Sequence, residues 1–159
     1  MAKHRVIVLA ALLLAGCTSA PSPPASPASR GGCAYDVRRD VLPAWARTGF
    51  SDPSPSGYPY VLGAKGDILA VVFGYPLAAS RPGDGPKNKI LWVSRIPVTV
   101  PDTLTLTARQ DGVPHPETRE VVGGPGPSII DLPRSGCWHL TLTWSGRTDT
   151  LDLRYDPAP

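Results

Sequence analysis

The sequence predicts an all-β protein, an antiparallel immunoglobulin-like β-sandwich of about eight strands with one short helical turn. Beyond residue 58, the apolar stretches either have strand length or alternate with polar residues at a period of two. Glycine, proline and aspartate interrupt them at roughly 8 to 15 residue intervals, as in sandwich domains. No strand–helix–strand alternation occurs, which argues against a parallel α/β sheet.

The strands are predicted individually from these patterns. Residues 68–73 are continuously apolar and indicate a central strand that is buried on both faces. Residues 103–109 alternate apolar side chains with threonine, which is typical of a half-buried strand. The one helical pattern, residues 40–47, should be capped near Asp40 and hold Pro43 in its first turn. We expect strands over residues 58–62, 67–75, 89–96, 103–109, 119–122, 128–132, 137–144 and 147–155.

The last two strands should form a hairpin with a two-residue loop at residues 145–146. This loop pairs Trp138 with Leu153 and gives both strands one apolar face, with Arg147 and Asp149 near the open end as exceptions. A one-residue slip would destroy the agreement between the strands, so the register is well specified. The expected core face carries Trp138, Leu140, Leu142, Leu151, Leu153 and Tyr155.

The N-terminus has the pattern of a bacterial export signal. Lys3 and Arg5 precede an apolar run over residues 6–14 that is too short to remain as a membrane span. Leu-Ala-Gly-Cys at residues 14–17 looks like a lipobox, so we expect residues 1–16 to be removed and Cys17 to carry lipid. That lipid would anchor the protein to the extracytoplasmic face of the cell membrane. A plain secretory signal that contains a cysteine is the alternative.

A tether and one domain should follow the signal. Residues 17–32 are rich in serine, alanine and proline and have almost nothing to bury, whereas residues 33–159 match the size of a single domain. Removal of residues 1–16 lowers the formal net charge from +3 to +1. Because no basic stripe with interleaved aromatic residues remains, no nucleic-acid partner is expected.

Cysteine usage predicts a disulfide between Cys33 and Cys137, because an even pair in an oxidising compartment is usually oxidised. In the chain-entropy model, closing a loop of about 100 residues stabilises a fold by up to roughly 4.7 kcal/mol. Free thiols or a metal-binding pair are the alternatives. The only histidines beyond the signal are His115 and His139, and their surroundings show no familiar ligand spacing, so no metal or cofactor is expected.

The hairpin register makes His139 and Asp152 cross-strand neighbours on the polar face. A histidine oriented by a carboxylate is the arrangement of a general base, which needs a nucleophile or a water beside it. No Gly-x-Ser-x-Gly elbow occurs in the chain. We therefore expect a solvated polar pair and no enzyme, and keep a hydrolase using these two residues as a minor alternative.

Residues 132–142 read Leu-Pro-Arg-Ser-Gly-Cys-Trp-His-Leu-Thr-Leu. This segment resembles one in a group of uncharacterised bacterial lipoproteins and secreted β-sandwich proteins, many of which carry a lipobox and a Ser/Pro tether. The resemblance covers the signal, the tether and about 25 C-terminal residues. It implies location and fold, and it implies no activity.

These observations favour a lipid-anchored extracytoplasmic module that binds or supports another component of the cell envelope. A small-molecule or carbohydrate binding protein is the alternative, with the loops over residues 50–60 and 81–89 at one rim. Trp45 should plug one end of the sandwich in preference to lining a groove. The candidate ligand or partner contacts are Trp45, Tyr58, Tyr60, Arg81, Lys87 and Lys89.

Overall fold

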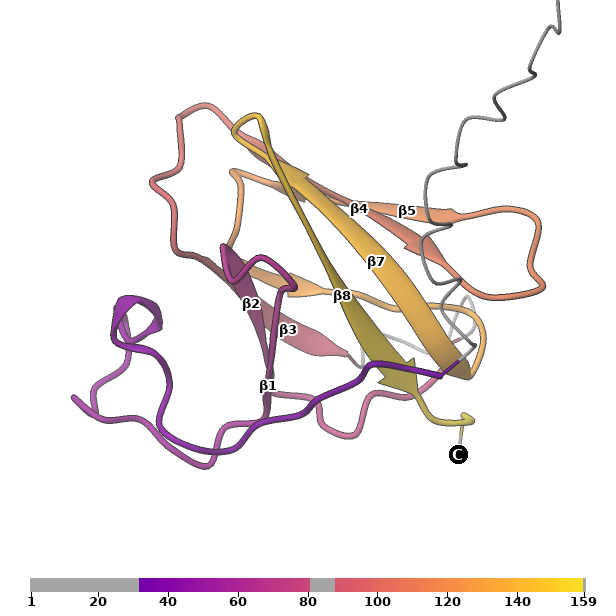
Figure 1. The fold of residues 1–159 in the computed structure, drawn as a ribbon, viewed down its shortest axis with the longest axis horizontal. Coiled ribbons are helices and arrows are strands. Elements are labelled where there is room, and N and C mark those ends of the chain that lie inside the picture. Colours follow the sequence, from indigo (N-terminus) through magenta and orange to yellow (C-terminus); the bar gives the residue numbers. More distant parts are fainter. Residues whose placement is uncertain (1–31, 81–87, 159) are drawn as a thin grey trace, which may run out of the picture. The chain divides into compact units, whose positions relative to one another are not determined.

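Two four-stranded antiparallel sheets form the protein (Figure 1). The computed structural model describes residues 32–80 and 88–158. One sheet has the order β1-β2-β3-β6 and the other has the order β5-β4-β7-β8. The strands are β1 (Tyr60–Leu62), β2 (Ile68–Val72), β3 (Lys89–Ser94), β4 (Thr103–Arg109), β5 (Glu117–Val122), β6 (Pro127–Ile129), β7 (Gly136–Trp144) and β8 (Arg147–Tyr155).

The order of the strands confirms the predicted immunoglobulin-like sandwich. In that fold one sheet contains strands G, F, C and C′, and the other contains A, B and E. Here β8-β7-β4-β5 corresponds to the first sheet and β2-β3-β6 to the second, with β1 added beside β2. The chain therefore crosses between the sheets after β3, after β5 and after β6.

The register of the C-terminal hairpin is the predicted one. Trp138 pairs with Leu153, and Trp144 pairs with Arg147 on either side of the two-residue loop. Both loop residues have positive φ, 43° at Ser145 and 69° at Gly146, as the tight turn that suits strand twist requires. The six side chains expected on the core face are all buried.

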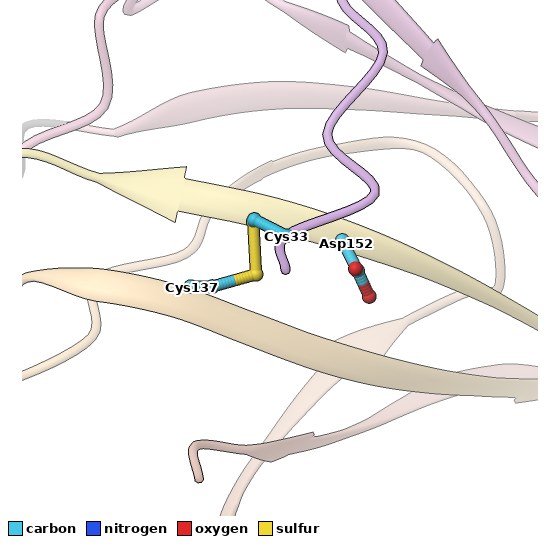
Figure 2. Close-up of side chains that lie close together, drawn as sticks. All are labelled: Cys33, Cys137 and Asp152. Carbon is cyan, nitrogen blue, oxygen red and sulfur yellow. A yellow bond between two sulfur atoms is a disulfide. The ribbon is translucent and has the colours of Figure 1, made fainter. Parts of the chain in front are cut away.

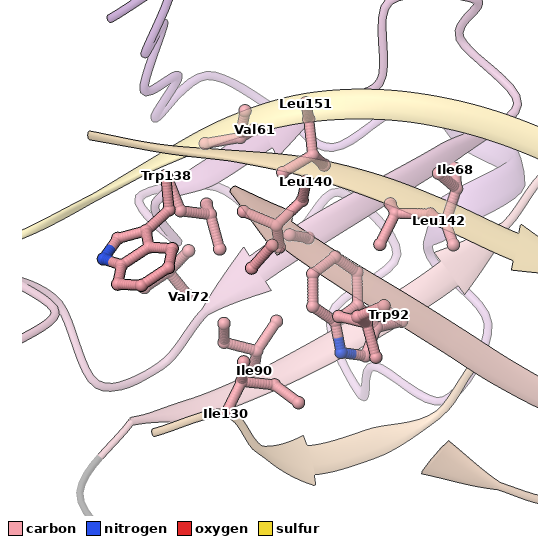
Figure 3. Packing of buried hydrophobic residues seen from close by; sticks show 14 of the residues in the cluster. Val61, Ile68, Val72, Ile90, Trp92, Ile130, Trp138, Leu140, Leu142 and Leu151 are labelled. Atoms are coloured by element: carbon pink, nitrogen blue, oxygen red, sulfur yellow. The ribbon is translucent and has the colours of Figure 1, made fainter. Parts of the chain in front are cut away.

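The inner core lies between the two sheets (Figure 3). Ile90 and Trp92 of β3 belong to the same buried cluster as Leu140 and Leu142 of β7. The indole of Trp92 donates a hydrogen bond to the Ser128 hydroxyl at 2.9 Å, so its polar atom is satisfied inside the fold. Burial of each such side chain contributes on the order of 2 kcal/mol, which makes this cluster the main source of stability.

Strand β2 is buried on both faces, as predicted. Ile68 points into the inner core, whereas Leu69 and Val71 belong to a second cluster on the outer face of the sheet. The predicted strand over residues 67–75 was too long, because β2 ends at Val72. Phe73, which was expected within the buried run, is 43% exposed.

Residues 39–59, which we call the covering loop, lie over that second cluster. Arg38 and Tyr60 exchange two backbone hydrogen bonds of 2.9 Å, so the two ends of the loop are held side by side. Two side chains of the loop, Leu42 and Ala46, are fully buried in the cluster with Leu69 and Val71 of β2. The predicted helical turn is a single 3₁₀ turn, Ala44–Ala46, within this loop.

Two local expectations for the covering loop were wrong. Asp40 does not cap the 3₁₀ turn, which has no side-chain cap, and instead its carboxylate accepts a hydrogen bond of 2.8 Å from the Tyr60 hydroxyl. Trp45 does not plug an end of the sandwich. It packs against the second cluster on the outer face of the sheet, because the loop that carries it runs across that face.

A buried carboxylate joins the two sheets. Asp149 of β8 is fully buried and accepts hydrogen bonds from the backbone amides of Lys65 at 2.9 Å and Asp67 at 3.1 Å, in the turn between β1 and β2. It also accepts one from Thr150 at 2.8 Å. A Cβ on Gly63 would collide with this carboxylate, so the turn requires glycine there. Asp149, one of the two exceptions in the hairpin pattern, thus links the two sheets.

We expect Asp149→Ala to lower the free energy of unfolding by about 3 kcal/mol, because backbone amides inside the fold lose a charged acceptor. Gly63→Ala should cost about 2 kcal/mol through overpacking. In the double variant the new methyl group no longer meets the carboxylate and keeps only the 3.0 Å approach to the Ile68 carbonyl, so the combined loss should be smaller than the sum by about 1 kcal/mol or more. Urea unfolding of the four proteins measures this coupling, and strictly additive losses would contradict the proposed contact.

Candidate functional site

The predicted disulfide is present and ties the start of the domain to β7 (Figure 2). Cys33 and Cys137 are 104 residues apart in sequence, and their Cα atoms are 5.5 Å apart. The backbone amide of Ala34 donates a hydrogen bond of 2.8 Å to the carboxylate of Asp152 on β8. The chain entering the domain is therefore fixed to both strands of the hairpin.

His139 and Asp152 are paired as predicted, with 2.8 Å between the imidazole Nδ1 and the carboxylate Oδ1. The second ring nitrogen, Nε2, faces another carboxylate, that of Asp111, at 3.8 Å. In a catalytic triad this nitrogen faces the nucleophile instead. The second oxygen of Asp152 is occupied by the Ala34 amide. The geometry fits a pair that holds the entering chain better than a general base.

The two cysteine sulfurs and a carboxylate oxygen of Asp152 lie within 4.8 Å of one another. This is close enough for three metal ligands, but cysteine binds metals as a thiolate. In the structure both sulfurs are joined in the disulfide, so they offer no thiolate. The cluster is a covalent link beside a hydrogen-bonded carboxylate.

An open depression of about 460 Å³ lies on the outer face of the β1-β2-β3-β6 sheet. We call it the aromatic depression. Its rings form a row, with centroids 5.2 Å apart between Phe50 and Tyr58 and 5.8 Å apart between Tyr58 and Phe73. The rings are tilted or edge-on, the arrangement that aromatic pairs prefer. It is lined by Thr48, Gly49, Phe50, Ser51, Tyr58, Phe73 and Leu91.

The local sequence explains why these rings reach the surface. Phe73 follows the last residue of β2, where the strand no longer places alternate side chains in the core. Gly57 has a φ of 78° and donates its amide to the Arg39 carbonyl, which turns the covering loop back toward β1 just before Tyr58. Residues far apart in sequence therefore meet on one face.

One cation lies beside the aromatic depression, and a second lies near the segment that carries Tyr58, since the Arg39 guanidinium donates to the Gly57 carbonyl at 3.4 Å. The Lys89 ammonium is 5.6 Å from the centre of the Phe73 ring. The Arg39 guanidinium is 4.8 Å from the centre of the Tyr75 ring, and Tyr75 is 41% exposed. Contacts of this kind are attractive because the face of an aromatic ring is electronegative. Together with the depression they form a surface that is both aromatic and positively charged.

Burial raises the pKa of two tyrosines, Tyr35 against the inner core and Tyr60 in the outer cluster. Burial, with lesser effects of Tyr75 and Asp156, raises the pKa of Tyr35 to about 12, and its hydroxyl has no hydrogen-bond partner among the described residues. Burial, followed by the hydrogen bond to Asp40, also raises the pKa of Tyr60. Both phenols are therefore uncharged at neutral pH.

The structure brings some of the predicted contact residues together and separates others. Tyr58 lines the depression, and Lys89 lies over Phe73 beside it. The expectation for Tyr60 does not hold, because its side chain is buried and bonded to Asp40. Trp45 packs on the outer cluster and is not part of the lining. Arg81, Lys87 and Cys17, with the signal and most of the tether, lie outside the described residues.

Sequence reasoning missed Phe73, Leu91 and Arg39. The periodic pattern assigned Phe73 to the buried strand, and only the glycine after it hinted that the strand ends there. Leu91 was expected simply as a strand residue. Nothing in the sequence singled out Arg39, because its position beside Tyr75 depends on the path of the covering loop.

No match was found with models of protein families, with curated proteins or with solved structures. Among residues 32–80 and 88–158, no helix is long and apolar enough to cross a membrane. The function must therefore be inferred from the chain's own geometry.

If Asp152 holds the entering chain, Asp152→Ala should lower the free energy of unfolding by about 1 kcal/mol and speed exchange of the Ala34 amide hydrogen about fivefold. Thr148→Ala, on the same polar face, should change neither quantity and is the control. Amide hydrogen exchange of wild type and of both variants, with the disulfide intact, measures the exchange rate at Ala34 and the global stability. An Ala34 amide that exchanges equally fast in wild type and Asp152→Ala would show that the carboxylate does not fix the chain.

Proposed function

We propose that this protein is a non-enzymatic binding module, anchored by lipid on Cys17 to the extracytoplasmic face of the cell membrane. It contacts another component of the cell envelope through the aromatic depression. The observation that carries this proposal is the row of Phe50, Tyr58 and Phe73, three rings that line an open surface instead of the core. Soluble proteins seldom gather aromatic side chains at an open surface without a binding role.

The shape of the aromatic depression supports binding without chemistry. Its volume of about 460 Å³ lies within the range of ligand pockets, and aromatic and apolar side chains make up much of its lining. The lining residues include no histidine, cysteine or carboxylate that could act as a base or nucleophile. The His139 and Asp152 pair belongs to β7 and β8, strands of the other sheet.

The expected lipid anchor agrees with the oxidised pair of cysteines. A disulfide is stable in an extracytoplasmic compartment, and Cys33 and Cys137 are bonded to each other. Cys17 therefore remains the one cysteine of the chain without a partner in this disulfide. It stands directly after the Leu-Ala-Gly sequence that signal processing of lipoproteins requires.

The anchor is tested with Cys17→Ser, which removes the thiol that would carry lipid. Wild-type protein should sediment with membranes and enter the detergent phase, whereas the variant should be soluble or remain unprocessed, because its acyl chains are lost. Fractionation followed by mass spectrometry of the N-terminal peptide measures both properties. An unmodified Cys17 on membrane-bound wild type would contradict the lipid anchor.

The binding surface is tested by photo-crosslinking in intact cells. Benzoylphenylalanine at Tyr58 or Phe73 should give a discrete, reproducible adduct, because both positions line the depression. The matched control is the same label at Thr141, an exposed position on the outer face of β7. Adducts of equal yield from both faces, or none from the depression, would remove the support for this surface.

A further inference from the structure

We infer that the aromatic depression takes an anionic saccharide chain, whose ring faces lie on the aromatic side chains and whose carboxylate or phosphate groups meet Lys89 and Arg39. This inference rests on the proposed function and names the class of its ligand. Three features carry it: the aromatic rings, the hydroxyls that bond to no described side chain, and the two cations.

The first feature is the row of rings. The face of a sugar ring presents C–H bonds with a slight positive charge, which suit the electronegative face of Phe or Tyr. Phe50, Tyr58 and Phe73 offer several such faces at different tilts along one open depression. An open site of this kind can receive an internal segment of a chain, whereas an enclosed pocket would accept only a free end.

The second feature is the set of hydroxyls among the rings. Thr48, Ser51 and Tyr58 each bring a hydroxyl group to the lining. None of these three hydroxyls takes part in a side-chain hydrogen bond with a described residue, unlike the hydroxyl of the buried Tyr60, which is bonded to Asp40. Hydroxyls donate and accept hydrogen bonds, and so do the hydroxyls of sugars. A purely apolar ligand would leave this capacity unused.

The third feature is positive charge that is not paired with a carboxylate of the described residues. Lys89 and Arg39 form no ion pair with a carboxylate of the described residues, and each is positioned over a ring. The covering loop also carries two carboxylates, of which Asp40 accepts a hydrogen bond from Tyr60 and Asp52 accepts one from the Ser54 amide, and neither forms an ion pair with Lys89 or Arg39. Lysine and arginine bind carboxylate and phosphate groups strongly, so the complementary ligand is an anion.

An acidic peptide is the competing occupant, and the hydroxyls favour the saccharide. One common mode of peptide recognition adds the peptide as a further strand at an exposed sheet edge. The lining strand residue Leu91 belongs to β3, an interior strand that pairs with β2 on one side and with β6 on the other. The depression therefore offers side chains and no strand edge. Side chains suit a ligand that binds through its rings and hydroxyl groups.

The experiment measures binding of three polymers to the full-length protein in detergent micelles by isothermal titration calorimetry at low salt. Polygalacturonate carries rings, hydroxyls and carboxylates, its fully methyl-esterified form keeps the rings without the charge, and polyglutamate keeps the charge without the rings. We expect polygalacturonate to bind at least about tenfold more tightly than either of the others, and to weaken as salt screens the charges.

Variants locate the bound polymer on the surface. Lys89→Gln and Arg39→Gln should each weaken binding of polygalacturonate about fivefold, and Phe73→Leu, which keeps an apolar side chain, should weaken it similarly through loss of the ring. Arg154→Gln removes an equal charge from β8 in the other sheet and should leave binding unchanged. Equal weakening by Arg154→Gln would mean that net charge alone attracts the polymer and would overturn the inference.

The other outcomes separate this inference from the proposed function. Equal binding of the methyl ester would show a saccharide surface without charge selection, and equal binding of polyglutamate would show a surface for acidic polymers in general. Either result overturns the inference and keeps the binding function. If no polymer binds while crosslinking from Tyr58 captures a discrete partner, the ligand class is wrong and the function stands. If no polymer binds and crosslinking captures no partner, both the inference and the proposed function are wrong.

Discussion

The arrangement of the two sheets depends on one buried carboxylate. Asp149 belongs to β8, yet it accepts hydrogen bonds from backbone amides of the turn between β1 and β2. A buried ion is expensive unless its oxygens are fully bonded, so its position allows little freedom. The Ala64 amide, which donates to the Thr150 carbonyl at 2.8 Å, strengthens the same link. The hydrophobic effect is non-directional, whereas this hydrogen-bonded contact is directional and fixes where β1 and β2 stand relative to the hairpin. Through β2 it also fixes the end from which Phe73 emerges.

The sequence predicts the parts of this fold whose determinants are local. The hairpin of β7 and β8 was predicted in register because leucine and tryptophan alternate with threonine in both strands and the turn contains Ser145-Gly146. Asp149 broke that pattern, and its meaning could not be predicted, because its partners are amides more than 80 residues away. Backbone amides have no signature in the sequence. The same limit applied to the outer cluster, where an irregular segment covers a sheet without any period that a pattern could detect.

The sequence predicted which loops would contribute to a candidate site, but not most of the residues that line it. The loops over residues 50–60 and 81–89 were expected at one rim of the sandwich. In the structure Tyr58 lines a depression on the outer face of a sheet, and Lys89 lies over Phe73 beside it. Their partners could not be predicted, since Phe73 resembles the buried residues before it and differs only in standing one position beyond the end of β2. Tyr60 shows the reverse error, because it was expected as a surface contact within the strand over residues 58–62, and its side chain is buried at the start of β1. Exposure of a large side chain is decided by where a strand stops, and strand ends depend on tertiary contacts.

The closure of the covering loop has a consequence for how this protein can diverge. Because Arg38 and Tyr60 are paired, residues 39–59 leave and rejoin the sheet at one point. Lengthening a loop whose ends are already joined costs little entropy, and the strands beneath need not move. Most of the lining of the depression comes from this one segment, whereas the disulfide and the Asp149 link belong to the scaffold. Related chains could therefore exchange this segment as a cassette and acquire new recognition while they inherit an unchanged sandwich.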